Sequence, residues 1–146
     1  MARDDFDLLS FLPYLLNQAA EKSSLGFQAY YKGTYGFLRT EWRVLFHLGR
    51  YGEMTAVEIG KQAMIHKTKI SRAVARLAER RFVTRREDAA DRRREVLSLT
   101  PSGRKAFEDL CQKAAEYDRD CVAELSQEEA RVLRSALRRL AKVSRD

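Results

Sequence analysis

Apolar residues recur at spacings of three and four along most of the chain, which is the period of an amphipathic α-helix. These stripes lie in about residues 7–32, 40–48, 67–80, 101–122 and 127–143. The segment 33–38 carries two glycines and is expected to form a loop. The pattern therefore predicts a protein built mainly of helices.

Capping residues mark where several of these helices begin. Thr40 is a candidate N-cap, and Thr55 and Ser126 are each followed three residues later by a glutamate, which is the pattern of a capping box. Thr100 precedes Pro101, and proline is favoured at the first helical position. Four helix starts are thus predicted from hydroxyl side chains.

Two short helices with a tight break between them form the middle of the chain. The first is expected over residues 56–62, the break over 63–66 and the second helix over 67–80. One face of the second helix is apolar, and the opposite face carries Lys69, Arg72, Arg76 and Arg80. This arrangement indicates a helix-turn-helix with one basic face.

The period changes after residue 81. Residues 82–87 and 95–100 are short and rich in Val, Thr and Leu, and residues 88–94 between them form a polar turn that contains three arginines. Two such segments around a polar turn predict a β-hairpin. The predicted fold class is mainly α with a small β-hairpin wing, a winged helix-turn-helix plus a helical dimerisation region.

The positive charge is concentrated in this central part. The chain has 146 residues, enough for about one domain, and a net charge of +7. Residues 61–94 hold 12 Lys and Arg against 4 acids, whereas the rest holds 16 bases and 17 acids. A concentrated positive field attracts polyanions such as double-stranded DNA. The alternatives are a solvated basic face and a surface for an acidic protein partner.

Other classes of protein lack their signatures here. We find no glycine-rich phosphate loop, no Cys-x-x-Cys and no spaced metal-ligand set, so we expect no enzyme, no cofactor and no metal site. No apolar stretch is long enough to span a membrane and the first residues do not read as a signal peptide, so a cytoplasmic protein without membrane contact is expected. Cys111 and Cys121 are expected to be reduced, buried and inert thiols.

Three motifs together carry a resemblance to a known family. Residues 91–100 (DRRREVLSLT) form an Asp-x-Arg turn that leads into a strand ending in Leu-Thr, with Gly103 three residues further on. Residues 41–45 (EWRVL) and 69–77 (KISRAVARL) precede it. In this order and spacing, the chain resembles the MarR family of bacterial transcriptional regulators over almost its whole length. The resemblance implies a dimer whose N- and C-terminal helices interlock.

The apolar surface also points to a dimer. The first helix and the last two carry more apolar residues than one small winged domain can cover, and a two-fold dimer would match an inverted-repeat operator. We therefore expect an N-terminal dimerisation helix and loop in residues 1–38, the DNA-binding domain in 39–100 and C-terminal dimerisation helices in 101–146.

One position departs from the family pattern. The family usually has a glycine after the recognition helix, where a residue with positive φ ends the helix, and this chain has Arg81 there. Either Arg81 adopts the left-handed conformation or the helix ends differently. The angle of the hairpin depends on which of the two occurs.

The first turns of the recognition helix and the tip of the wing are the expected DNA contacts. The candidate residues are His66, Lys67, Thr68, Lys69, Ser71, Arg72, Arg76, Arg92, Arg93 and Arg94. Arg72 could contact a guanine and Arg76 a phosphate, while the resemblance assigns Arg93 to the minor groove. Asp91 is expected to orient an arginine, because a free carboxylate would repel phosphate.

A small-molecule effector is the second expected partner. Eleven of the 14 aromatic residues lie in residues 6–51, and the family often binds small aromatic carboxylates or phenols between its dimer core and its DNA-binding lobe. The candidate lining residues are Tyr14, Gln18, Trp42, Arg43 and His47. The alternative is that these aromatic residues belong to the core or the dimer interface. The peroxide-sensing branch of the family is not expected, because the first helix has no cysteine near its start.

Taken together, these patterns predict a sequence-specific DNA-binding regulator. We expect a homodimeric repressor that binds an inverted-repeat operator and is released by a small aromatic or phenolic effector. The alternative function is an architectural winged-helix protein that binds DNA of any sequence through phosphates alone.

Overall fold

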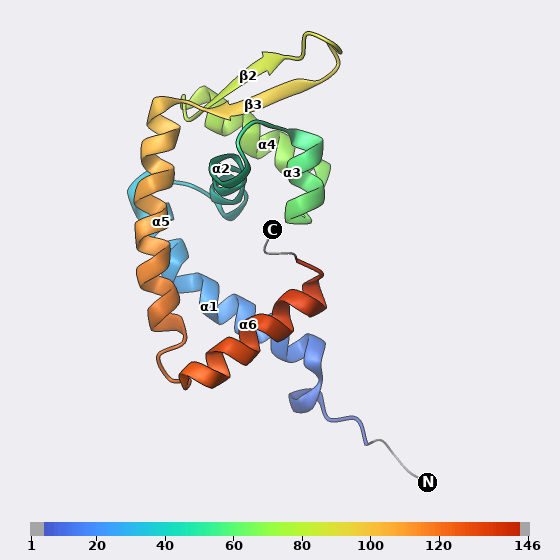
Figure 1. Cartoon of the computed structure of the whole chain (residues 1–146), viewed down its shortest axis with the longest axis vertical. Helices are drawn as coiled ribbons and strands as arrows, with labels where there is room; N and C mark the ends of the chain where they lie inside the picture. Colours follow the sequence, from blue (N-terminus) through green and yellow to red (C-terminus); the bar gives the residue numbers. More distant parts are fainter. Residues whose placement is uncertain (1–4, 144–146) are drawn as a thin grey trace.

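The computed structural model describes residues 5–143 as six α-helices, a 3₁₀-helix and a three-stranded antiparallel sheet (Figure 1). In chain order the elements are η1 (Leu8–Ser10), α1 (Leu12–Tyr35), α2 (Arg39–Tyr51), β1 (Met54–Thr55), α3 (Ala56–Ala63), α4 (Lys67–Glu79), β2 (Val83–Glu87), β3 (Glu95–Leu99), α5 (Pro101–Cys121) and α6 (Gln127–Ala141). The expected fold class is confirmed. The wing lies at one end of the molecule, and the start of α1 and helix α6 lie at the other.

Helix α2 forms the centre of the core. Its residues Val44, Leu45 and Leu48 share one helical face and are buried. Residues from α1, α3, α4, the sheet and α5 complete the same core: Phe27, Tyr31, Ile59, Ile70, Ala73, Val74, Leu77, Val83, Leu97, Ala106 and Leu110. The core therefore holds the helix-turn-helix, the sheet and the first part of α5 together as one packed unit.

The first helix begins later than the sequence indicates. Residues Leu8–Ser10 form a separate 3₁₀-helix, and the Asp7 carboxylate accepts a hydrogen bond from the Leu9 amide at 3.0 Å. Helix α1 begins at Leu12, which places Pro13 in its first turn. Proline has no amide hydrogen to donate, so it is tolerated in the first turn but not in the interior of a helix that started at residue 7.

The same helix also ends later, so the expected loop over residues 33–38 was largely wrong. Helix α1 continues to Tyr35, and Gly36 ends it with φ of 68°. The Gly36 amide bonds to the Lys32 carbonyl at 2.9 Å, and the Phe37 amide bonds to the Tyr31 carbonyl at 3.3 Å. A helix needs only one residue in the left-handed conformation at its end, and Gly36 supplies it. Gly33 therefore remains helical.

Helix α2 is capped by a carboxylate and not by Thr40. Its first residue is Arg39, and the Glu41 carboxylate accepts a hydrogen bond from the Leu38 amide at 2.8 Å. Of the two glycines near the end of this helix, Gly49 lies inside it, whereas Gly52 is its C-cap with φ of 82°. The cap also matters for the exposed face of α4, since Glu41 is the ion-pair partner of Arg76 on that helix.

The sheet contains a strand that the sequence did not indicate. Strand β1 has only two residues and pairs antiparallel with β3, Met54 opposite Leu97 and Thr55 opposite Val96. The expected hairpin is present, and β2 pairs with β3 from Val83 opposite Leu99 to Glu87 opposite Glu95 next to the turn. Because β3 is the central strand, the wing is joined to the segment between α2 and α3.

A tight joint connects the recognition helix, the wing and α5. The Thr100 hydroxyl donates to the Arg81 carbonyl at 2.7 Å and accepts from the Gly103 amide at 2.9 Å, which confirms its role as N-cap of α5. A Cβ on Gly103 would lie 2.0 Å from the Phe82 carbonyl oxygen. Only glycine allows the first turn of α5 to approach the base of the wing this closely.

Arg81 adopts the left-handed conformation, with φ of 64°. Of the two possibilities that the missing glycine left open, this is the one that occurs. The Phe82 amide bonds back to the Leu77 carbonyl at 2.9 Å, so the helix ends as it would with glycine. The chain therefore keeps the geometry of the turn at the cost of backbone strain.

We expect Arg81→Gly to raise the free energy of unfolding by about 1 kcal/mol, because glycine adopts positive φ without a Cβ clash. Urea denaturation followed by circular dichroism would measure this difference. Arg81→Ala is the matched control, since it removes the same side chain but keeps the Cβ. Equal stability of the glycine and alanine variants would contradict the presence of strain at this position.

Candidate DNA-binding surface

Helix α4 presents one buried face and one exposed basic face. Its residues Ile70, Ala73, Val74 and Leu77 are packed into the core. All seven candidate contacts around this helix are exposed: His66, Lys67, Thr68, Lys69, Ser71, Arg72 and Arg76. The ring nitrogen of His66 accepts a hydrogen bond from the Thr68 amide at 3.2 Å, so His66 is the N-cap. The expected set of side chains is thus brought together on one accessible helix.

Arg76 differs from the other cations of this helix because it contacts a buried carboxylate. Glu41 is 1% exposed, and its Oε1 lies 3.4 Å from Nε of Arg76. The same oxygen has no hydrogen-bond partner among the described residues, while Oε2 caps the Leu38 amide. A buried carboxylate needs a nearby cation or donor to offset its desolvation. Arg76 supplies that charge and keeps half of its side chain exposed.

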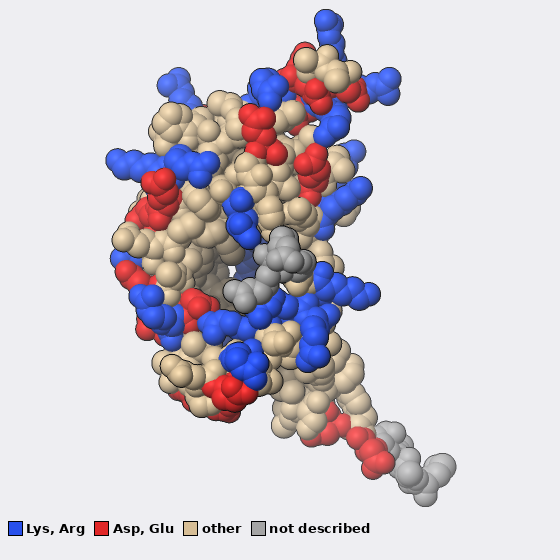
Figure 2. Space-filling view, in the orientation of Figure 1, with Lys and Arg blue, Asp and Glu red and all other residues tan. Residues whose placement is uncertain are grey.

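The wing extends past α3 and α4 at one end of the molecule (Figure 1), and Lys and Arg side chains extend from its tip (Figure 2). Its turn is held by two carboxylates, since Asp88 accepts from the Ala90 amide and Asp91 accepts from the Arg93 amide, both at 3.0 Å. The hypothesis that Asp91 orients an arginine needs a correction. Asp91 holds the backbone of Arg93 and not its guanidinium group.

The three arginines of the turn have different surroundings. Arg94 lies 3.0 Å from Glu58 and 3.9 Å from Asp88. Arg92 and Arg93 form no ion pair within residues 5–143, and both are exposed. The free positive charge of the wing is therefore at Arg92 and Arg93.

The effector candidates divide into two groups. Trp42 lies in an aromatic cluster with Phe27 and Phe46, with ring centroids 5.5 and 5.1 Å away. Tyr14 and Gln18 lie in the first half of α1, where Tyr14 is half-buried and Gln18 is exposed. Over the described part of the chain, no hydrogen bond or aromatic pair joins these two residues to the α2 candidates. The contacts of residues 5–143 therefore do not bring the five candidates together as one cluster.

The polar candidates on α2 already have partners in the chain. The Arg43 guanidinium donates to the Ala63 carbonyl at the end of α3. Burial lowers the pKa of Arg43, and repulsion from Arg39 lowers it further. A His47 ring nitrogen lies 2.7 Å from the Arg43 carbonyl. Arg43 thus connects α2 to the last turn of α3, a structural role that the sequence did not reveal.

A polar clamp between α1 and α5 was also missed. The hydroxyl groups of Tyr30 and Tyr35 both donate to one oxygen of Asp109, each at 2.6 Å. These bonds stabilise the carboxylate and lower the pKa of Asp109. Burial and the Asp109 charge raise the pKa of Tyr35. Asp109 lies 79 positions after Tyr30 and 74 after Tyr35, so no local pattern could identify the clamp.

The two cysteines behave differently from the expectation that both are buried. Cys111 is partly buried and Cys121 is exposed, and neither forms a disulfide. Burial raises the pKa of the Cys111 thiol, which disfavours the reactive thiolate. Between residues 5 and 143, no group of three potential metal ligands comes together. Among the same residues, no helix is both long and apolar enough to cross a membrane.

Arg76→Ala is expected to lower the free energy of unfolding by about 1–2 kcal/mol, because it leaves the buried Glu41 carboxylate without a cation. Arg72→Ala is the matched control one turn earlier, since Arg72 has no such partner, and it should leave stability unchanged. Urea unfolding of both variants gives the comparison. If both variants unfold at the same urea concentration, the ion pair makes no net contribution.

Known proteins share both the sequence pattern and the fold. The sequence profile of the MarR family matches residues 35–94. A probable transcriptional regulator from Pseudomonas aeruginosa is 31% identical, covers 92% of this chain and 99% of its own, and superposes with a TM-score of 0.80. The MarR family regulator SPO1453 from Silicibacter pomeroyi is 27% identical over 95% of this chain and 98% of its own, with a TM-score of 0.82.

A third structure adds a likeness in fold. Bordetella bronchiseptica BpsR, whose DNA binding is regulated by 6-hydroxynicotinic acid, is 21% identical over 97% of this chain and 100% of its own, with a TM-score of 0.84. The basic helix, the arginines at the tip of the wing and the similar proteins all indicate the same family. The chain belongs to the MarR family of DNA-binding transcriptional regulators.

Proposed function

We propose that this protein is a homodimeric repressor that binds an inverted-repeat operator and is released from it by a small aromatic or phenolic ligand. Residues 39–100 form the DNA-binding unit, and residues 1–38 and 101–146 form the dimer. The observation that carries the proposal is the separation of two surfaces. Free cations gather on α4 and the wing, whereas exposed apolar side chains gather on α1 and α6.

The DNA-binding surface suits a duplex in two ways. Helix α4 has the width for the major groove, where Thr68, Ser71 and Arg72 reach base edges from its first turns. Arg93 at the wing tip suits the minor groove, whose negative potential attracts a planar cation. His66, Lys67, Lys69, Arg76 and Arg92 surround these residues and neutralise phosphates.

The dimer is supported by apolar surface that one protomer leaves uncovered. The large exposed apolar residues at the two ends of the chain are Phe6, Leu8, Leu9, Phe11, Leu12, Leu15, Leu125, Val132, Leu133, Leu137, Leu140 and Val143. Patches of this kind on a soluble protein mark association surfaces. A second copy of the chain covers them and places two α4 helices on one side of the dimer, which matches a two-fold symmetric operator.

An aromatic effector is supported by the surface near α1 and α2 and by the BpsR structure, in which the regulating ligand is an aromatic acid. Tyr14 and Gln18 are not committed to the core of the protomer and provide a phenol and an amide. A partner protomer packed against α1 would add further lining residues to this surface. Ligand release of DNA needs only a several-fold difference in affinity between the two states.

Selection of a randomised duplex library on the protein at about 150 mM salt tests the DNA-binding part, because non-specific binding is weak there. We expect an inverted repeat with half-site centres about 10 base pairs apart. Arg93→Ala should bind the recovered duplex more weakly, with a shallower salt dependence. Arg119→Ala on α5 is the matched control and should bind like the original protein.

Two other outcomes would contradict this proposal. Equal binding of all duplexes with a steep salt dependence would identify an architectural DNA-binding protein. Absence of binding even at low salt would indicate an acidic protein partner. Sedimentation of the free protein separately checks the dimer.

The effector is tested by titrating 6-hydroxynicotinic acid and a set of hydroxybenzoic acids into the complex with the recovered duplex. We expect at least one compound to raise the dissociation constant about 5- to 150-fold, the usual range of coupling between two sites. Gln18→Ala should weaken that response without changing DNA affinity in the absence of ligand. Lys22→Ala, one turn further along α1, is the control. A response that is identical in both variants would exclude Gln18 from the site.

A further inference from the structure

The positive charge of the wing is divided between paired and unpaired arginines. Each of three arginines in or next to the strands has a carboxylate partner at 3.0 Å: Arg85 with Glu95, Arg86 with Glu53, and Arg94 with Glu58. Arg92 and Arg93 at the tip have none in the described part of the chain. The wing therefore consists of a neutralised base and a cationic tip.

Two of these carboxylates occupy related positions in the chain. Glu53 directly precedes β1, and Glu58 lies in the first turn of α3, three residues after β1 ends. Both therefore lie outside the hairpin, while their partners lie within it. Because β1 pairs with the central strand β3, the two carboxylates have a defined position relative to the sheet. Glu53 contacts strand β2 through Arg86, and Glu58 contacts the end of the turn through Arg94.

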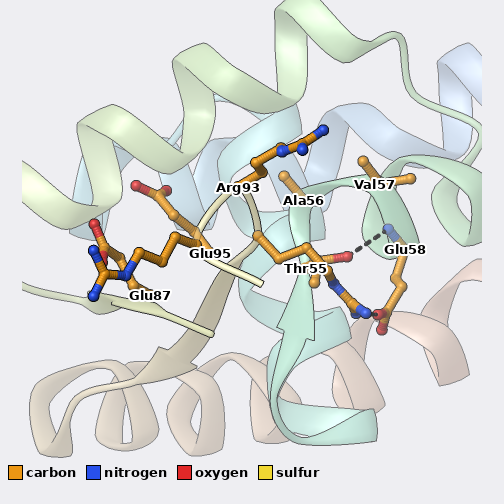
Figure 3. A pocket seen from close by; sticks show the side chains of 9 residues that line it. Thr55, Ala56, Val57, Glu58, Glu87, Arg93 and Glu95 are labelled. Atoms are coloured by element: carbon orange, nitrogen blue, oxygen red, sulfur yellow. Dashed lines mark hydrogen bonds and ion pairs between the residues drawn. The ribbon is translucent and has the colours of Figure 1, made fainter. Parts of the chain in front are cut away.

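The Glu58 carboxylate does not cap its own helix but binds Arg94. Thr55 caps α3 by accepting a hydrogen bond from the Glu58 amide at 3.2 Å (Figure 3), as the expected capping box requires. The reciprocal bond, in which the Thr55 amide would donate to the Glu58 carboxylate, is not formed. The carboxylate instead accepts a hydrogen bond from Arg94 at 3.0 Å. The side chain thus serves a contact between two elements and not the cap of its own helix.

Arg94 is held from both sides. Its Nε lies 3.9 Å from the Asp88 carboxylate, and its carbonyl oxygen accepts from the Asp88 amide at 2.9 Å. Its guanidinium group therefore bridges the base of the turn and the first turn of α3. A cation between two carboxylates is poorly placed to neutralise a DNA phosphate.

The space between the wing and α3 is open where the ion pairs do not fill it. A pocket of about 510 Å³ lies there, lined by residues of the turn, the strands and the start of α3. Figure 3 shows the Arg93 side chain directed away from Glu87 and Glu95. Core residues Val83 and Leu97 and the pairing of β1 with β3 hold the end of the wing next to the core, and the ion pairs of Arg86 and Arg94 restrain it nearer the turn.

We propose that Glu53 and Glu58, through Arg86 and Arg94, are positioning residues that set the angle of the wing relative to α4. Their role in DNA binding is to place Arg93 in the minor groove while α4 occupies the major groove. In this arrangement Arg94 holds the wing and does not contact DNA, which changes the role predicted for it from the sequence. The inference rests on the proposed binding of a specific duplex.

If the carboxylates acted only through their charge, they would weaken DNA binding and not support it. Removing a negative charge close to DNA should strengthen binding to phosphates. If the carboxylates position the wing, their removal should weaken binding to the selected duplex. The two explanations therefore differ in the sign of the effect and not only in its size.

The experiment measures dissociation constants for the duplex recovered by selection, over a series of salt concentrations. We expect Glu58→Gln and Arg94→Ala each to weaken binding at least fivefold, although Glu58→Gln removes a negative charge near the DNA. Arg93→Ala should make the slope shallower by about 0.9, the value for one lost phosphate neutralisation. Glu87→Gln is the matched control, because Glu87 is an exposed wing carboxylate outside any ion pair of the described residues, and it should not weaken binding.

A variant that exchanges the charges of Glu58 and Arg94 distinguishes positioning of the wing from contact with phosphate. The double variant Glu58→Arg with Arg94→Glu restores the ion pair in reverse and should recover most of the affinity that Arg94→Glu alone loses. If Arg94 contacted phosphate, the double variant would remain as weak as the single one. Thermal unfolding of every variant checks folding, and the exchange variant keeps the test valid if a single variant is unstable.

The outcomes separate this inference from the proposed function. Absence of a preferred duplex for the unchanged protein overturns the proposed function and the inference together. Specific binding by the unchanged protein, combined with unchanged or tighter binding by Glu58→Gln, overturns the inference alone. Failure of the Glu58→Arg, Arg94→Glu exchange to recover any of the affinity lost by Arg94→Glu also overturns it.

Discussion

The packing of α4 against α2 is the constraint on which the DNA-facing surface depends. The apolar face of α4 is buried against Val44, Leu45 and Leu48, so its basic face has to point outward. The Glu41–Arg76 contact adds a charged pair at the edge of the same interface. An error of half a turn in α4 would expose apolar residues and bury cations, which is far more costly than any gain on the surface. The core thus orients the recognition helix before DNA is present.

The charges on this surface have two separate tasks. Arg76, Arg86 and Arg94 have carboxylate partners on other elements and hold those elements at defined distances. Arg72 and Arg93 have no such partner in the described chain, and their charge is available to a polyanion. Exposed ion pairs contribute little stability individually. Their value here lies in geometry, because a long hairpin converts a small change at its base into a large displacement at its tip.

A second set of contacts joins the DNA-binding unit to the helices at the two ends of the chain. Asp109 on α5 accepts from Tyr30 and Tyr35 on α1, and Arg80 at the end of α4 donates to the Tyr35 carbonyl. The Arg80 guanidinium also lies 5.2 Å from the ring centroids of Phe37 and Phe82. These contacts form a continuous path from α1 to the end of the recognition helix. A change in the angle of α1 would therefore reach α4 through packed groups and not through a flexible linker.

The sequence by itself determined the helices, the break before α4, the hairpin, three hydroxyl caps and the region of positive charge. Apolar periodicity and capping act over three or four residues, so they can be recognised in one dimension. Only the tertiary structure decided that β1 exists, that Asp91 holds a backbone amide, that Arg43 caps α3 and that Arg94 is paired while Arg93 is free. Each of these depends on the approach of groups that the chain folds together, and neither charge nor spacing along the sequence specifies which donor meets which acceptor.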